Sequence, residues 1–517
     1  MRLDKTRNTV RNIYSGIITR IVQIIFPFVI RTAFIYTLGV EYLGLNSLFT
    51  SILSVLSLTE LGVGSAMVFS MYKPLAEGDN QTVCALMNLY RKCYRAIGCI
   101  IAICGLMLLP FLPNLIKGSI PSDVNLYVLY LINLLSTVIT YFLFAYKNCL
   151  LEVHQRNDII NKINLVLSLL QYGIQIVVLI FIRNYYVYLI AAPIITISKN
   201  IITSVVVGKR YPQFKAVGNV SKEIISGIKK RVSALVMYKV GGIVLNSVDN
   251  IVISAFLGLS VLAIYNNYYY LITSLFGFLA IITSSMLAGV GNSVVTDSVE
   301  KNYTDFNRFL FMQLWIVSWC AITLFCLYQP FMYLWVGEDL MFSLDTTLFI
   351  ALLFYAWKIG DIVGLYKEAL GMWYEDRFRP LIGAAVNLII NIILVQKIGI
   401  NGIVISSIIS IVFITFPIAA HVLFKNYFKR SSAEFYKIQL KHFLATIVCG
   451  TVTFLCCKSL HSLSIWAFGA KMMICIVVPN VLLVLIYHKT ERYKEAKAFT
   501  VSTVRRLKNE SSRICSN

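Results

Sequence analysis

The chain has 517 residues, of which 58% are hydrophobic and only 14% are charged, and its mean hydropathy is +0.75. This composition excludes an ordinary soluble globular protein and indicates a membrane protein. The formal net charge of +22 would also suit a nucleic-acid-binding protein. However, the basic residues stand between long apolar runs, as they do at the ends of membrane spans. We therefore expect the lipid bilayer, and not nucleic acid, as a partner.

Apolar runs long enough to cross a bilayer recur along the whole chain. A membrane-spanning helix needs about 20 mostly apolar residues, and the run that follows the basic segment 1–12 is too long for the core of a signal peptide. The sequence predicts about 14 transmembrane helices and an all-α polytopic membrane protein. The predicted spans are 13–38, 43–71, 96–116, 126–146, 159–182, 186–207, 233–257, 260–292, 309–336, 344–366, 380–396, 401–424, 442–458 and 465–487.

The loops between these spans alternate in charge. The odd-numbered loops hold few cations, namely Lys117, Arg183, Lys397 and Lys458, whereas the even-numbered loops and both termini are strongly basic. Basic loops stay in the cytoplasm, so both termini are predicted to be cytoplasmic. The odd loops are also short, which leaves no room for an outside catalytic domain.

A weak internal repeat relates spans 1–6 to spans 7–12. A shift of 219 residues places Gly39 on Gly258 and Arg20 on Lys239. Repeats of six spans run in the same sense and place a substrate site between them. We therefore predict two pseudo-symmetric six-helix lobes, 1–207 and 233–425, joined by a cytoplasmic linker, 208–232. A C-terminal helix pair, 426–487, and a basic cytoplasmic tail, 488–517, complete the chain.

Two repeat-related cations, Arg20 and Lys239, lie deep in apolar spans. Such a cation costs roughly 3 kcal/mol or more unless it faces a wet cavity or a partner, so this pair predicts a cavity for an anion. Gln23 and Arg31 share one helix face with Arg20, with Pro27 between them. Arg31 either lines the same cavity or extends to the outer interface, and the sequence leaves both readings open.

The second candidate face carries Lys239, Asn246 and Asp249, at spacings of 0, 7 and 10 residues. An arginine offers a planar fork for a diphosphate and a lysine offers a mobile point charge. Asp249 has three readings: it holds the cations when substrate is absent, it binds a coupling ion, or it forms a structural pair with Lys239. Asn246 is predicted to be a polar partner of the substrate.

Three further ionisable residues lie within apolar spans. Lys358 and Asp361 are three residues apart and are expected to pair locally. Glu60 is either a titrating group for a coupling ion or a polar packing group. The chain has no nucleotide-binding or catalytic motif, so we predict no catalytic residue, no cofactor and no enzyme. Its 12 cysteines have no metal-like spacing and are expected to pack as small apolar residues, without a metal site.

Three segments resemble one transporter family. Residues 36–79 (YTLGVEYLGLNSLFTSILSVLSLTELGVGSAMVFSMYKPLAEGD), 150–158 (LLEVHQRND) and 246–272 (NSVDNIVISAFLGLSVLAIYNNYYYLI) resemble bacterial Wzx-like oligosaccharide flippases. These belong to the polysaccharide transport family, in the superfamily that also contains the MATE drug exporters. Ala263 departs from the family pattern, in which a glycine is expected before the tyrosine.

The resemblance implies a function. Family members flip an undecaprenyl-diphosphate-linked oligosaccharide repeat unit from the inner to the outer leaflet of the bacterial cytoplasmic membrane, for O-antigen, capsule or exopolysaccharide biosynthesis. Polymerase and chain-length proteins of the same pathway would then be partners. The alternatives are a drug/cation antiporter of the same fold, which favours an acidic cavity, and a membrane polysaccharide polymerase, which needs a sizeable outside loop.

Overall fold

The computed structural model describes residues 5–60, 62–118, 120–460, 462 and 464–502, and this part of the chain is helical without β-strands. The side chains of residues 5–20, 59, 230, 231, 233–240, 242, 243, 245, 246 and 288 lie outside the described residues. The helices are α1 (Lys5–Thr37), α2 (Val40–Leu56), α3 (Val63–Glu77), α4 (Asn80–Met107), α5 (Leu126–Phe142), α6 (Asn148–Val153), α7 (Asn157–Val177), α8 (Tyr185–Arg210), α9 (Lys222–Leu257), α10 (Leu259–Thr296), α11 (Val299–Val336), α12 (Leu344–Lys358), α13 (Asp361–Ala369), α14 (Arg379–Ile398), α15 (Ile400–Ile409), α16 (Phe416–Leu423), α17 (Ala433–Lys458) and α18 (Ile465–Tyr487).

The helices confirm an all-α polytopic membrane protein. Among the described residues, 9 helices are long and apolar enough to cross a bilayer, and two bent helix pairs raise this number to 11. Three shorter apolar helices, Ile21–Thr37, Val40–Leu56 and Ser247–Leu257, lie in the predicted spans 1, 2 and 7. Each of the predicted spans therefore corresponds to a helical segment of the structure.

The second predicted span is broken into two helices. The run 43–71 is one of the longest predicted spans, and within it α2 ends at Leu56, a 3₁₀ turn covers Ser57–Glu60, and α3 begins at Val63. Gly62 precedes α3 in the left-handed conformation, with φ of 87°, which glycine adopts at little cost. The break places the carboxylate of Glu60 between two helices.

The predicted repeat is visible in the positions where helices begin. Gly39 and Gly258, which are 219 residues apart, precede α2 and α10 with φ values of 110° and 96°. Asp79 and Ser298, at the same separation, are the N-caps of α4 and α11, and each side chain accepts a backbone N–H. The two halves thus share turn chemistry as well as span order.

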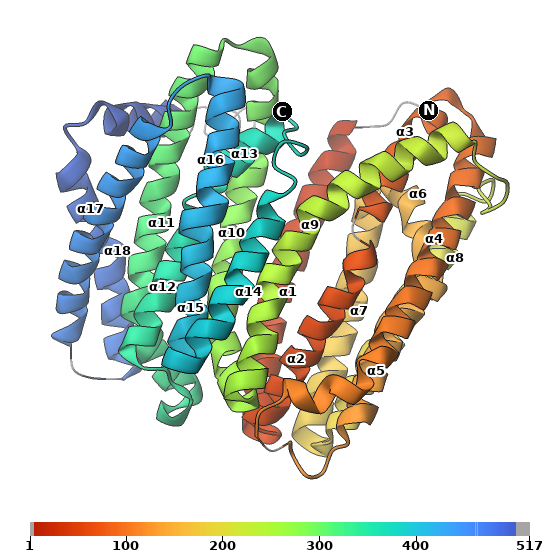
Figure 1. Cartoon of the computed structure of the whole chain (residues 1–517), viewed down its shortest axis with the longest axis horizontal. Coiled ribbons are helices and arrows are strands. Elements are labelled where there is room, and N and C mark those ends of the chain that lie inside the picture. The colour runs from red at the N-terminus through yellow and green to blue at the C-terminus, as the bar shows by residue number, and fades with distance from the viewer. Residues whose placement is uncertain (1–4, 61, 119, 461, 463, 503–517) are drawn as a thin grey trace, which may run out of the picture. The chain divides into compact units, whose positions relative to one another are not determined.

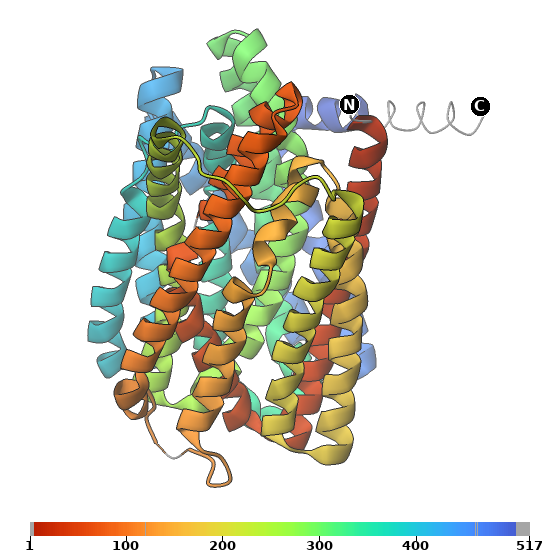
Figure 2. The ribbon, with the colours of Figure 1, turned by 90° about the vertical axis from the view of Figure 1, so that its right-hand side faces the viewer.

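The chain divides into two compact units, each described by itself. Unit 1 contains Met1–Asn267 and Pro380–Ile403, and unit 2 contains Tyr268–Arg379 and Val404–Asn517. In unit 1, α1 packs on α7, α7 on α8, and α5 on both α4 and α8, and Figure 2 shows these N-terminal helices facing the viewer. In unit 2, α11 packs against α12, α17 and α18 (Figure 1). The predicted lobe and linker boundaries remain a prediction.

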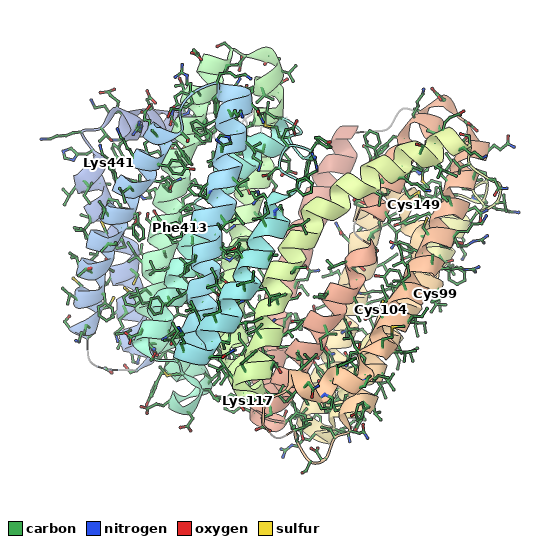
Figure 3. The ribbon with its side chains drawn as sticks, viewed as in Figure 1. Cys99, Cys104, Lys117, Cys149, Phe413 and Lys441 are labelled. Carbon is green, nitrogen blue, oxygen red and sulfur yellow. The ribbon has the colours of Figure 1, made fainter. Side chains whose placement is uncertain are left out.

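Two close helix contacts within unit 1 require glycine. A Cβ atom at Gly44 of α2 would collide with the backbone of Leu259, and one at Gly241 of α9 would collide with Pro380 at the start of α14. The loop after α4 also packs on α9, because the backbone N–H of Lys117 (labelled in Figure 3) donates to the Ser254 carbonyl at 2.9 Å. Close backbone contacts with the start of α14 and with the loop after α4 therefore hold α9 within unit 1.

The start of the basic tail packs on unit 2. Residues 491–502 are helical, and Arg492 forms an ion pair with Glu434 of α17 at 2.9 Å. The Tyr493 ring stacks on Trp315 of α11 with centroids 5.9 Å apart. This part of the tail is therefore held against α11 and α17 by protein contacts.

Candidate functional site

Helix α1 carries the first set of predicted site residues. It runs unbroken through Pro27, and its sequence contains five basic residues and no acidic one. The Arg20 side chain lies outside the described residues, and the Gln23 side chain is exposed. Arg31 is half-buried, and its Nη1 donates to Oδ1 of Asn267 on α10 at 2.8 Å. This bond favours the interior reading of Arg31 over extension to the outer interface.

Asn267 is a partner of the candidate residue Arg31 that sequence reasoning missed. It is fully buried and belongs to the Asn266–Asn267 pair near the start of α10. Asn266 donates to Asn250 of α9 at 3.3 Å, and Asn250 donates to the Ser51 hydroxyl of α2 at 2.8 Å. Two adjacent amides inside an apolar span were the available signal, because buried amides need hydrogen-bond partners.

Helix α9 carries the second predicted set. The side chains of Lys239 and Asn246 lie outside the described residues, so the pairing of Lys239 with Asp249 remains a prediction. Asp249 is buried, and its Oδ1 accepts a hydrogen bond of 2.6 Å from Nδ2 of Asn391 on α14. The same Asn391 Nδ2 lies 3.1 Å from Oδ1 of Asn387, which is also buried.

This group on α9 and α14 is where an ion could be held. Asp249, Asn387 and Asn391 bring one carboxylate and two amide groups together within unit 1. Carboxylate and amide oxygens are the ligands that hard cations take in proteins. Sequence reasoning found Asp249 but missed both asparagines, because α14 lies more than a hundred residues away along the chain.

Glu60 is held by tyrosine hydroxyls at the break between α2 and α3. Its Oε1 accepts from Tyr94 of α4 at 2.7 Å, and its Oε2 accepts from Tyr141 of α5 at 2.6 Å. Tyr90 extends the network, because its hydroxyl donates to that of Tyr94 at 2.7 Å. The carboxylate is thus bound by neutral donors on both sides.

Lys358 and Asp361 form the local pair that their spacing predicts. Nζ of Lys358 lies 2.9 Å from Oδ2 of Asp361, and Nε2 of Gln313 on α11 lies 3.4 Å from the same oxygen. The ammonium also lies 4.3 Å from the centroid of the Phe276 ring, as a cation–π contact. Lys358 ends α12 and Asp361 begins α13, so the ion pair spans the junction between these two helices.

Ion pairs follow the fourth span of each repeat. In the first half, Arg156 binds Asp158 at 2.8 Å, and the hydrogen bond to this aspartate raises the pKa of Arg156. In the second half, Asp376 is buried and pairs with both Lys367 and Arg379. These pairs fix two loops that the charge pattern predicts to be cytoplasmic.

The geometry is that of a polytopic helical membrane protein with polar groups held between apolar helices, and its fold has known counterparts. No family model matches the chain, and no curated protein matches its sequence. The structure is similar to that of the lipid II flippase MurJ in an inward closed conformation, with a TM-score of 0.62 and 16% identity over 93% of this chain and 99% of that one.

Two MATE structures show the same likeness. An inward-facing multidrug resistance MATE family transporter of the MOP superfamily aligns with a TM-score of 0.55 and 14% identity, over 80% of this chain and 99% of that one. A MATE transporter from Vibrio cholerae aligns with a TM-score of 0.54 and 16% identity, over 82% of this chain and 98% of that one. The chain therefore has the fold that these flippase and exporter structures share.

Proposed function

We propose that this protein is a flippase, and not an enzyme, that moves an undecaprenyl-diphosphate-linked oligosaccharide repeat unit to the outer leaflet of the bacterial cytoplasmic membrane. The observation that carries the proposal is the charge of α1, which places Arg20 and Arg31 within an apolar span that has no acidic residue. Two intramembrane cations on one face suit a diphosphate. The fold it shares with a lipid II flippase supports the same function.

The competing function is a drug/cation antiporter of the same fold. Such a transporter needs acidic groups where its cationic substrate binds. Three acidic groups within the spans have protein partners: Glu60 binds two tyrosine hydroxyls, Asp249 binds Asn391, and Asp361 binds Lys358. This pattern favours an anionic substrate over a cationic one.

Transport would follow the alternating-access scheme of repeat-built transporters. Arg20, Arg31 and Lys239 would bind the diphosphate, and Gln23 and Asn246 would donate hydrogen bonds to it or to the first sugar. The prenyl chain would stay in the lipid. Polymerase and chain-length proteins of the same pathway would act on the product at the outer face.

Coupling would use Asp249 or Glu60, which accept hydrogen bonds from an asparagine and from two tyrosines, respectively. Asp249, with Asn387 and Asn391, offers oxygens for a cation, whereas Glu60 could exchange a proton within its tyrosine network. Lys358 and Asp361 would then have a structural role, because their charges already compensate each other.

Reconstitution tests the proposal. Purified protein in liposomes is given a fluorescent undecaprenyl-diphosphate-linked sugar, and flipping is read by a membrane-impermeant quencher. We expect flipping by the wild type, its loss in Arg20→Gln and Lys239→Gln, and normal rates in the control Arg183→Gln, which removes an exposed loop cation. Uptake of a cationic dye instead of the lipid, or normal flipping by the double variant, would refute the proposal.

A further inference from the structure

Three cysteines that are distant in the sequence meet inside unit 2. Cys326 of α11, Cys457 of α17 and Cys475 of α18 are buried, with exposed fractions of 5%, 3% and 0%. Their Sγ atoms all lie within 4.8 Å of one another. Apolar side chains, including Ile322 and Leu483, surround the three thiols. Figure 1 shows these three helices side by side.

The sulfurs are close to the spacing of a three-coordinate metal site, because one separation is 3.8 Å and all lie within 4.8 Å. Metal–thiolate bonds are about 2.3 Å long for a first-row ion, and three sulfurs placed trigonally at that distance lie about 4.0 Å apart. Sγ of Cys457 lies 3.8 Å from Sγ of Cys475, which is too long for a disulfide bond of about 2.05 Å. A metal ion could therefore enter with little movement of the helices.

The donor set selects the metal. Thiolates are soft ligands that favour Cu(I) and Zn²⁺, and structural zinc requires four tetrahedral ligands. The cluster found among the described residues has three ligands and an apolar surround, which suits trigonal Cu(I). We propose that Cys326, Cys457 and Cys475 form a Cu(I)-binding site, independent of the transport function proposed above.

The charge balance of the site is also favourable. When Cu(I) binds, two thiols release their protons to solvent and the third remains neutral, so the centre carries one negative charge and no electron is transferred. Lys471 is a buried cation, 8% exposed, one helical turn before Cys475 on α18. Because residues four apart share a helix face, its ammonium offsets that charge.

The bound ion would join three helices. Cys326 lies on span 9 of the second repeat, whereas Cys457 and Cys475 lie on the two helices outside the repeat. A metal that binds only the folded protein stabilises it. The site would thus hold the C-terminal helix pair against α11.

The test is a Cu(I) titration of purified full-length protein under ascorbate, in competition with a chromogenic Cu(I) chelator. We expect the wild type to retain about one equivalent more than Cys326→Ala, Cys457→Ala or Cys475→Ala. Cys449→Ala is the matched control, because Cys449 is buried on α17 but lies outside the three-thiol group. Exposed thiols such as Cys99 and Cys104 (Figure 3) contribute equally to all variants.

Two further measurements decide the result. Cu(I) should raise the melting temperature of the wild type and of Cys449→Ala only, and X-ray absorption should find about three sulfur neighbours. If the melting temperature of an alanine variant, measured without copper, differs from that of the wild type, the corresponding serine variant is used in its place. Equal retention by all variants, or a disulfide between Cys457 and Cys475 in the isolated protein, would overturn the proposal.

Discussion

The hydrogen bond between Arg31 and Asn267 offers a quantitative test of the proposed transport site. The guanidinium donates to the fully buried amide at 2.8 Å, and hydrogen bonds that involve a charged group contribute about 1.5–3 kcal/mol. We expect the guanidinium to form an interaction of similar strength with the diphosphate during transport. Removing that interaction would lower the flipping rate at low substrate roughly 10- to 150-fold. We therefore expect Arg31→Gln to show a loss in this range.

We expect Asn267 to position the arginine, because its Oδ1 accepts from the guanidinium. Asn267→Ala keeps the charge but frees the guanidinium, so we expect a smaller loss than in Arg31→Gln. The two changes should also be non-additive, because residues in direct contact couple by about 0.5–3 kcal/mol. Arg31→Lys keeps the charge without the fork and should fall between wild type and Arg31→Gln.

The assay is the initial rate of flipping in proteoliposomes at low substrate. Each variant is first compared with the wild type in elution volume and melting temperature, and Arg183→Gln serves as the charge-removing control. Strictly additive losses in Arg31→Gln and Asn267→Ala would show that the two residues act separately. An unchanged rate in Arg31→Gln would remove Arg31 from the transport site.

Four further predictions concern topology, stability and energetics. A lone cysteine at Asn219, in a cysteine-free background, should resist a membrane-impermeant thiol reagent in intact cells, and ready labelling would invert the topology. Asp376→Asn leaves two paired cations without their counter-charge and should cost about 3–5 kcal/mol, seen as a lower melting temperature, whereas exposed Glu338→Gln should not. Burial lowers the pKa of His154 below 6.5, so the unfolded chain binds a proton at a higher pH than the folded protein does. The free energy of unfolding should therefore fall as the pH drops below 6.5. An equally steep fall of that free energy in His154→Gln would contradict this prediction. A diphosphate carrying two charges should gain about 4–5 kcal/mol from an outward step across 100 mV, and flipping that ignores an imposed valinomycin–potassium potential would exclude this drive.

The sequence predicted the helices well because their signals are local. Long apolar runs and left-handed glycines define where most spans lie, as at Gly39 and Gly258. The break at Glu60 was not predictable in this way. It lies within a continuous apolar run, and the groups that hold its carboxylate, Tyr94 and Tyr141, come from α4 and α5. Only tertiary structure brings those hydroxyls to the turn.

The partners of the candidate site residues could not be predicted either, because they come from helices that are distant in the sequence. A helical face could be read from spacing, which placed Gln23 and Arg31 together, but the residues of other helices that face them could not. Asn267 lies 236 residues from Arg31, and Asn391 lies 142 residues from Asp249. Helix packing determines such pairs, and a single sequence contains no periodic signal for it.

The fourth predicted span of each half is broken near a carboxylate, and the two carboxylates have different kinds of partner. In the first repeat this span is bent by 48° between α5 and the segment Ala145–Val153, and Tyr141, just before the bend, binds Glu60. In the second half, Lys358 lies before the junction of α12 and α13 and binds Asp361. That ion pair brings two opposite charges together at one junction, whereas Glu60 accepts hydrogen bonds from the neutral hydroxyls of Tyr94 and Tyr141, which come from two other helices. A change in the hydrogen bonding of Glu60 would therefore act, through Tyr141, directly on the bent helix.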